Sequence, residues 1–225
     1  IWCTGCLLND LDDTTWTDYF LTANHCVANQ LEADDTEFYW FFQTGTCDGA
    51  APAISSVTAT DGGAEYLAGK TEAQGSDFAF LKLRKPSPDG ASFLGWSSKD
   101  PAEGEAVTCI HHPLGEYKRI SFGVNVDGDA DFRYVQWSSG VTAEGSSGSP
   151  LFNASNEVIG QLWGGESTCE NPTGLDYFGR FDATYKAISP WLDGTKGTED
   201  IFGYLCDPLD QGLTTPGSYD GYFFN

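Results

Sequence analysis

Short runs rich in aromatic and β-branched residues alternate with turn-forming clusters along most of the 225-residue chain. The clusters include DGG at 61–63, KPSPDG at 85–90 and DGDAD at 127–131. Regular spacing of short strands is typical of a sandwich or barrel, not of alternating β–α units. The 27 glycines suit the many tight turns that such a fold needs. We therefore predict an all-β fold.

The pattern also places individual elements along the chain. Two short helices are expected, around 24–29 and 184–192, and a loose tail is expected after Asp193. The predicted strands are 18–22, 37–44, 54–60, 78–84, 106–111, 118–126, 132–137, 150–153, 158–163 and 177–182.

The formal net charge of −22 limits the partners of this chain. Such a field repels nucleic acid and anionic lipid, so we expect neither as a partner. No apolar run approaches the roughly 20 residues that span a bilayer. We interpret the acidic surface mainly as a source of solubility, with attraction of cationic substrates as the alternative.

Seven cysteines indicate disulfides and an oxidising, extracellular compartment. The odd count leaves one thiol unpaired, or paired with another segment. Cys3 and Cys6 form a single Cys-x-x-Cys pair without a second, which argues against zinc. Asp127, Asp129 and Asp131 alternate as in a calcium loop, but the glycine and closing glutamate are missing. We expect no metal and no cofactor.

Three segments carry residues suited to acyl transfer: DYFLTANHCVAN with His25, GSDFAFLKL with Asp77, and VTAEGSSGSPLF with Ser147. Taken singly, the histidine is an ordinary surface or core residue, the aspartate a turn residue and the Gly-Ser run a linker. A nucleophilic serine needs a base, a carboxylate that orients the base, and N–H donors for the oxyanion. The order His, Asp, Ser in these three contexts favours the catalytic interpretation.

These segments resemble the trypsin-like serine proteases, with TANHC as the histidine box, DFAFLKL as the aspartate strand and GSSGSP as the nucleophile loop. The bacterial lysyl endopeptidase branch is the most similar, through YWFFQTGTC, AVTCIHHPLGEYKRIS and GQLWGGESTC. The resemblance runs from Cys3 to about Asp193. It implies two six-stranded antiparallel β-barrels with the active site between them, and a short C-terminal helix.

The same resemblance implies a division of the chain. Residues 1–85 would form the first barrel lobe, 86–193 the second, and 194–225 a tail. Chains of this family start a few tens of residues earlier, so we expect the first barrel to lack its N-terminal strand.

The resemblance assigns Ser147 as nucleophile, His25 as general base and Asp77 as the orienting carboxylate. The backbone N–H groups of Gly145 and Ser147 would form the oxyanion hole. Trypsin carries an aspartate at the position of Ser146, which pairs with a new N-terminus. Because a serine stands here, Ile1 is not interpreted as an activation terminus, and Ser146 is interpreted as scaffold.

Asp176 aligns with the pocket carboxylate of lysyl endopeptidases, and Val141 stands where trypsin has its pocket acid. A buried carboxylate would favour a lysine or arginine side chain before the scissile bond. Trp163, Gly164 and Gly165 match the segment that pairs with the substrate as an added strand. The family has histidine at the position of Trp163, so cleavage after arginine stays open.

The resemblance further implies a Cys3–Cys26 disulfide beside the histidine loop. Cys47 and Cys169 match family positions that pair with a segment upstream of the chain. The remaining three have no family pairing, and Cys6 with Cys109 is a guess. These five cysteines are Cys6, Cys47, Cys109, Cys169 and Cys206.

The predicted function is a secreted serine endopeptidase that cuts proteins or peptides after lysine. The alternatives are a catalytically silent, protease-like binding protein and a subunit or fragment of a larger extracellular assembly. His111 and His112 are interpreted as structural, with a pocket histidine for acidic substrates as the rival hypothesis. The oligomeric state stays open.

Overall fold

The computed structural model describes residues 1–194 except 13, 48 and 100. The helices are α1 (Gln30–Asp34) and α2 (Phe181–Leu192), with 3₁₀ turns at Ile54–Ser56 and Pro113–Gly115. The strands are β1 (Cys6–Leu8), β2 (Tyr19–Thr22), β3 (Phe38–Trp40), β4 (Thr58–Thr60), β5 (Ala64–Lys70), β6 (Phe78–Leu83), β7 (Phe93–Leu94), β8 (Ala106–His111), β9 (Arg119–Gly128), β10 (Phe132–Ser139), β11 (Pro150–Phe152), β12 (Val158–Gly165) and β13 (Leu175–Arg180). Neither described helix has the length and apolar character needed to cross a membrane. The predicted all-β class is confirmed.

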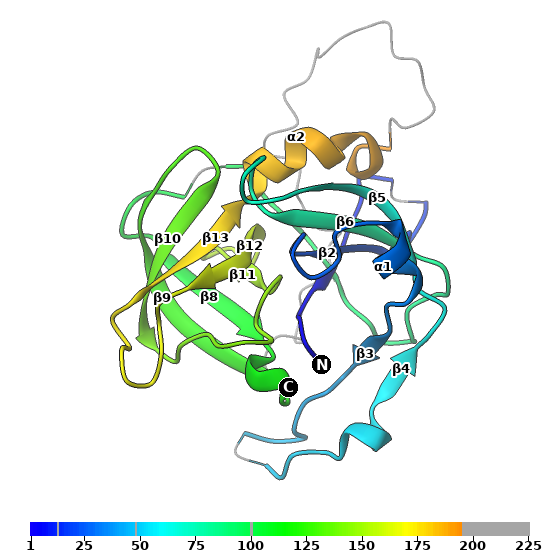
Figure 1. Cartoon of the computed structure of the whole chain (residues 1–225), viewed down its shortest axis with the longest axis horizontal. Helices are drawn as coiled ribbons and strands as arrows, with labels where there is room; N and C mark the ends of the chain where they lie inside the picture. The colour runs from blue at the N-terminus through cyan, green and yellow to red at the C-terminus, as the bar shows by residue number, and fades with distance from the viewer. Residues whose placement is uncertain (13, 48, 100, 195–225) are drawn as a thin grey trace, which may run out of the picture.

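The second lobe is a closed six-stranded barrel in the order β10-β13-β12-β11-β8-β9, with antiparallel neighbours (Figure 1). Burial alternates along β8 and β10, as the pleat requires. In β8, Val107, Cys109 and His111 are buried while Ala106 is exposed. The barrel and the C-terminal helix were both predicted, and both are confirmed.

The first lobe is an open five-stranded sheet, β5-β6-β2-β1-β7, with β3 and β4 as a separate two-stranded sheet. β7 pairs with β1 in parallel, with Leu7 opposite Phe93. The chain that follows β6 therefore returns to the edge of the first sheet. A cavity of about 1020 Å³ lies beside β1, β2 and β3, and Leu7, Phe20 and Phe38 line it. The missing N-terminal strand of the first barrel stays a prediction.

The two lobes share one apolar core. In α2, Tyr185, Ile188 and Leu192 recur at helical spacing, so they form one buried face, and this face packs on the core between the lobes. Trp96 is fully buried in that core, and its indole N–H donates to the Asn9 carbonyl at 2.8 Å. The helix lies across the top of both lobes in Figure 1. The shared core fixes how the two lobes meet.

Local backbone geometry corrects several predicted boundaries. The helix predicted at 24–29 is wrong, because α1 begins only after Asn29, whose side chain caps the N–H groups of Leu31 and Glu32. The strand predicted at 37–44 ends at Trp40, because Phe41 has a φ of +57°. The strand predicted at 54–60 starts as a 3₁₀ turn, and only 58–60 form a strand. Strands β1, β5 and β7 were not predicted.

Candidate active site

His25 lies in the turn that follows β2. The N–H groups of Cys26 and Val27 both approach the carbonyl of Ala23, at 3.2 and 3.4 Å, which closes the turn. The expected disulfide between Cys3 and Cys26 is confirmed and ties this turn to the start of β1. The His25 side chain keeps 39% of its surface exposed and borders the cavity beside β1, β2 and β3.

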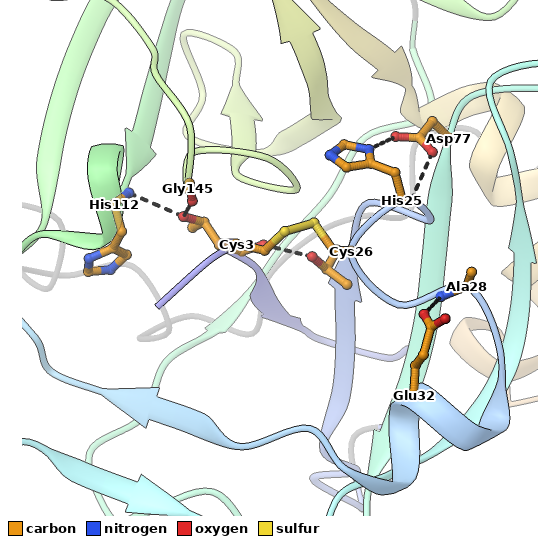
Figure 2. The surroundings of a disulfide bond; sticks show 10 residues. Cys3, His25, Cys26, Ala28, Glu32, Asp77, His112 and Gly145 are labelled. Atoms are coloured by element: carbon orange, nitrogen blue, oxygen red, sulfur yellow. Dashed lines mark hydrogen bonds and ion pairs between the residues drawn. A yellow bond between two sulfur atoms is a disulfide. The ribbon is translucent and has the colours of Figure 1, made fainter.

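Asp77 orients this imidazole. The carboxylate is fully buried, and its Oδ2 lies 2.6 Å from Nδ1 of His25 while its Oδ1 accepts the His25 backbone N–H at 3.2 Å (Figure 2). A carboxylate at Nδ1 holds the ring proton there and leaves Nε2 free to act as a base. The φ of Asp77 is +49°, a left-handed conformation that a non-glycine residue seldom adopts. Strain of this kind is typical of residues held for function.

Ser147 lies in a tight loop between two glycines with positive φ, Gly145 at +87° and Gly148 at +80°. A side chain at Gly148 would collide with the Thr22 hydroxyl and the Thr4 carbonyl. This close contact brings the loop against the end of β2, where the histidine turn begins. No hydrogen bond joins the Ser147 hydroxyl to the imidazole of His25 in the described part of the chain.

The loop presents two unused N–H groups. Within the described residues, neither the N–H of Gly145 nor that of Ser147 donates a hydrogen bond, although Ser146 between them donates to Ala143 at 3.0 Å. The neighbouring carbonyls are occupied: Thr4 Oγ1 donates to Gly145 at 2.8 Å, and Thr4 N–H donates to Ser147 at 2.8 Å. Two free N–H donors, one of them that of the serine itself, are the arrangement that an oxyanion requires.

Asp176 lies on β13 with no exposed surface. Its Oδ2 accepts hydrogen bonds from Trp137 Nε1 at 2.6 Å, Thr142 Oγ1 at 2.7 Å and Ser167 Oγ at 2.7 Å. Its Oδ1 accepts only the Ser167 backbone N–H, at 3.1 Å. Among the described residues, no basic side chain forms an ion pair with Asp176. The buried anion therefore keeps acceptor capacity at Oδ1 and lacks a counter-charge.

The end of β12 borders this carboxylate. A Cβ at Gly165 would collide with Asp176 Oδ1, while a Cβ at Gly164 would meet nothing within 4 Å. Trp163 is 37% exposed and packs between Phe132 and Tyr177, with ring centroids at 5.4 and 5.9 Å. The two glycines leave the strand edge open, and the indole forms a wall next to it.

The remaining cysteines do not pair as guessed. Cys6 and Cys109 are both buried and reduced, so the guessed bond between them is wrong. They belong to different cores, Cys6 to the one between the lobes and Cys109 to the barrel interior. Cys47 and Cys169 are exposed free thiols, and Cys206 lies outside the described residues.

Among the described residues, one group has the proximity of a metal site: Cys3, His25 and Cys26. The two sulfurs are joined in a disulfide, so neither is a thiolate that could bind a metal. The imidazole alone remains, and it already pairs with Asp77. This group therefore does not make a metal centre.

The closed barrel, the open sheet beside it and the core that they share define a chymotrypsin-like fold. A solved structure of a Glu endopeptidase matches with a TM-score of 0.59 and 16% identity, over 85% of this chain and 85% of that one. The family model described as "Lysyl endopeptidase, C-terminal domain" matches residues 1–179. The chain therefore belongs to the lysyl endopeptidase family.

Two curated relatives extend the comparison. The chain is 36% identical to a lysyl endopeptidase of Pseudomonas aeruginosa over 84% of its own length, and spans 43% of that protein. It is 27% identical to the secreted RxLR effector protein 73 of Plasmopara viticola over 70% of its own length, and spans 39% of that protein.

Several residues around the site were missed or underrated in the sequence. Thr4 holds the nucleophile loop from the first lobe, yet a threonine between two cysteines carries no signal. Gln161 donates to the carbonyl of Ser76 at 2.6 Å, next to Asp77, and only tertiary structure brings these residues together. His111 was noticed and interpreted as structural.

Proposed function

We propose that this chain is a serine endopeptidase in which Ser147 attacks the scissile carbonyl. His25 takes the serine proton through Nε2 and later gives it to the leaving amine. Asp77 holds the imidazole in that tautomer and stabilises the imidazolium. The N–H groups of Gly145 and Ser147 receive the oxyanion. The proposal is carried by the Asp77–His25 contact at 2.6 Å and by the two free N–H donors of the Ser147 loop, which packs against the end of β2.

The substrate preference that we propose is lysine before the scissile bond. A lysine ammonium supplies the positive charge that the buried Asp176 lacks, and the open acceptor site of Oδ1 lies beside Gly165, where the substrate strand would pass. Because Trp163 replaces a histidine of the family, arginine remains a second substrate. Secretion is also part of the proposal, supported by the disulfide and the acidic surface.

The test uses peptides that differ only in the residue before the bond: Lys, Arg, norleucine, Glu and Ala. Wild-type protein is expected to cleave after Lys, and Ser147→Ala to lose about 10⁴-fold or more in kcat. Ser155→Ala, an exposed serine in the turn after β11, is the matched control and keeps the wild-type rate. Folded wild-type protein without cleavage of any peptide would contradict the proposal and favour a binding role.

Asp176→Asn tests the pocket separately. Removing the charge from a buried pair is expected to lower kcat/KM for Lys by about 10²- to 10³-fold. The rate for the norleucine peptide, whose side chain has the carbon chain of lysine without the ammonium group, is expected to stay within about threefold. An unchanged Lys-to-norleucine ratio would remove Asp176 from this role and leave the triad intact.

A further inference from the structure

A buried imidazole lies behind the nucleophile loop. His111, at the end of β8, is 1% exposed. Its Nδ1 lies 2.8 Å from Ser146 Oγ, and its Nε2 lies 3.1 Å from Ser121 Oγ on β9. The ring is thus fixed at both nitrogens, and one of its partners is the residue directly before Ser147.

The surrounding partners determine where the protons lie. Ser121 Oγ donates its one proton to the Val141 carbonyl at 3.2 Å, so it must accept the N–H of His111 Nε2. Nδ1 then carries no proton and accepts from the hydroxyl of Ser146. That hydroxyl oxygen in turn accepts the N–H of Ala143 at 3.2 Å. This tautomer of His111 gives both ring nitrogens and the hydroxyl groups of Ser121 and Ser146 a hydrogen-bond partner.

The hydrogen bonds of His111, Ser121 and Ser146 reach residues on both sides of the turn in the nucleophile loop. Val141 and Ala143 lie before the turn, and Ser146 lies between Gly145 and Ser147, whose N–H groups are free. A side chain at Gly140 would collide with Ser121, so the loop runs directly against β9 here. The imidazole therefore ties β8 and β9 to the segment that carries both oxyanion donors.

We propose that His111 is a positioning residue that holds Ser146, and through it the two oxyanion N–H groups, in the orientation needed for catalysis. The inference rests on the proposed function and deepens it. It also explains how the loop is held although Ser146, unlike the aspartate at this position in trypsin, carries no charge for an ion pair with an N-terminus. Here the neutral hydrogen bond between the Ser146 hydroxyl and the His111 imidazole takes the place of that ion pair.

Burial supports the neutral state of the ring. Desolvation, followed by the nearby charges of His112 and Arg119, lowers the pKa of His111 to about 4. The imidazole is therefore uncharged near neutral pH, and its Nδ1 can accept a hydrogen bond from the Ser146 hydroxyl.

The experiment compares His111→Phe, His111→Asn and Ser146→Ala in hydrolysis of the preferred lysyl peptide. The amide oxygen of asparagine is as many bonds from Cα as Nδ1, so it can still accept from Ser146, whereas phenylalanine cannot. We expect kcat to fall about 10- to 100-fold in His111→Phe and Ser146→Ala, with KM within about threefold. His111→Asn is expected to recover most of that loss. Affinity for a lysyl peptide aldehyde, whose adduct needs the oxyanion hole, is expected to fall in parallel with kcat/KM.

Two controls separate positioning from loss of stability. Ile159→Ala creates a space in the same barrel core away from the loop, so it is expected to lower the unfolding temperature without lowering kcat. If His111→Phe does not fold, the kcat of Ser146→Ala tests the inference, because this substitution removes a single oxygen atom and is expected to disturb folding less. Wild-type kcat in folded Ser146→Ala and His111→Phe would overturn the inference alone. An inactive wild type, or an active Ser147→Ala, would overturn the proposed function as well.

Discussion

Thr4 Oγ1 donates to the carbonyl of Gly145 at 2.8 Å and accepts the N–H of His112 at 3.2 Å. One hydroxyl from the first lobe therefore holds the nucleophile loop against the 3₁₀ turn after β8, and Figure 2 shows His112 and Gly145 converging on this point. We expect Thr4→Val, which keeps the shape but loses both bonds, to lower kcat about tenfold.

Thr60→Val is the matched control for this prediction, because Thr60 Oγ1 accepts from the Trp40 indole in the β3–β4 sheet, far from the loop. It is expected to lower the free energy of unfolding by about 1 kcal/mol with unchanged kcat. Steady-state kinetics and urea unfolding of both variants measure this difference. Equal kcat in Thr4→Val and wild type would show that the loop is held without Thr4.

Gln161 links the second lobe to the segment before Asp77. Its Nε2 donates to the Ser76 carbonyl at 2.6 Å, and its Oε1 accepts from Thr184 of α2 at 3.4 Å. Gln161→Leu leaves the Ser76 carbonyl buried without a partner, so we expect about tenfold lower kcat/KM and a loss of about 1–3 kcal/mol of stability. Gln136→Leu, an exposed glutamine on β10, is the control and is expected to change neither quantity. Unaltered kinetics in Gln161→Leu would argue that Asp77 is held by its own loop.

The buried imidazole of His111 makes stability depend on pH. Because its folded pKa of about 4 lies below the ordinary value of 6.5, the unfolded state takes up the proton first as the pH falls. The stabilisation is complete above pH 6.5 and is lost as the pH falls towards 4, by up to about 3 kcal/mol. Urea unfolding of wild type and His111→Asn across this range isolates the contribution. Parallel stability curves for the two proteins would contradict it.

The Cys3–Cys26 disulfide closes a loop with a sequence separation of 23. Removing both cysteines as Cys3→Ala/Cys26→Ala is expected to lower the free energy of unfolding by about 3 kcal/mol, since the unfolded chain regains the loop entropy. Cys47→Ala, which replaces an exposed free thiol, is the control and is expected to leave stability unchanged. Thermal unfolding of both variants tests this prediction. Equal unfolding temperatures of the double mutant and wild type would mean that the disulfide contributes little to stability.

Strands rich in β-branched and aromatic residues could be predicted from the sequence, and weakly patterned ones could not. Strand β8 was predicted to the residue because it contains the β-branched residues Val107, Thr108 and Ile110. Strand β5 was missed because Glu65, Gly69 and Lys70 interrupt its apolar pattern, and its pairing with β6 decides its conformation. Strands β1 and β7 have three and two residues, too short for any periodic signal.

The candidate site shows the same division. The segments carrying His25, Asp77 and Ser147 are local motifs, so their residues could be chosen from the sequence. The residues that hold them come from distant parts of the chain: Thr4 lies 141 positions from Gly145, and Gln161 lies 85 from Ser76. Such contacts depend on how the two lobes meet, which no local pattern encodes.

The most direct test of the central claim is covalent labelling of the folded protein with a fluorophosphonate, followed by intact-mass and peptide mass spectrometry. A nucleophilic Ser147 activated by His25 and Asp77 is expected to give a single adduct on the peptide that contains Ser147. The adduct is expected to be absent in Ser147→Ala and strongly reduced in His25→Ala. Folded wild-type protein that stays unlabelled, or carries the adduct on another residue, would contradict the account.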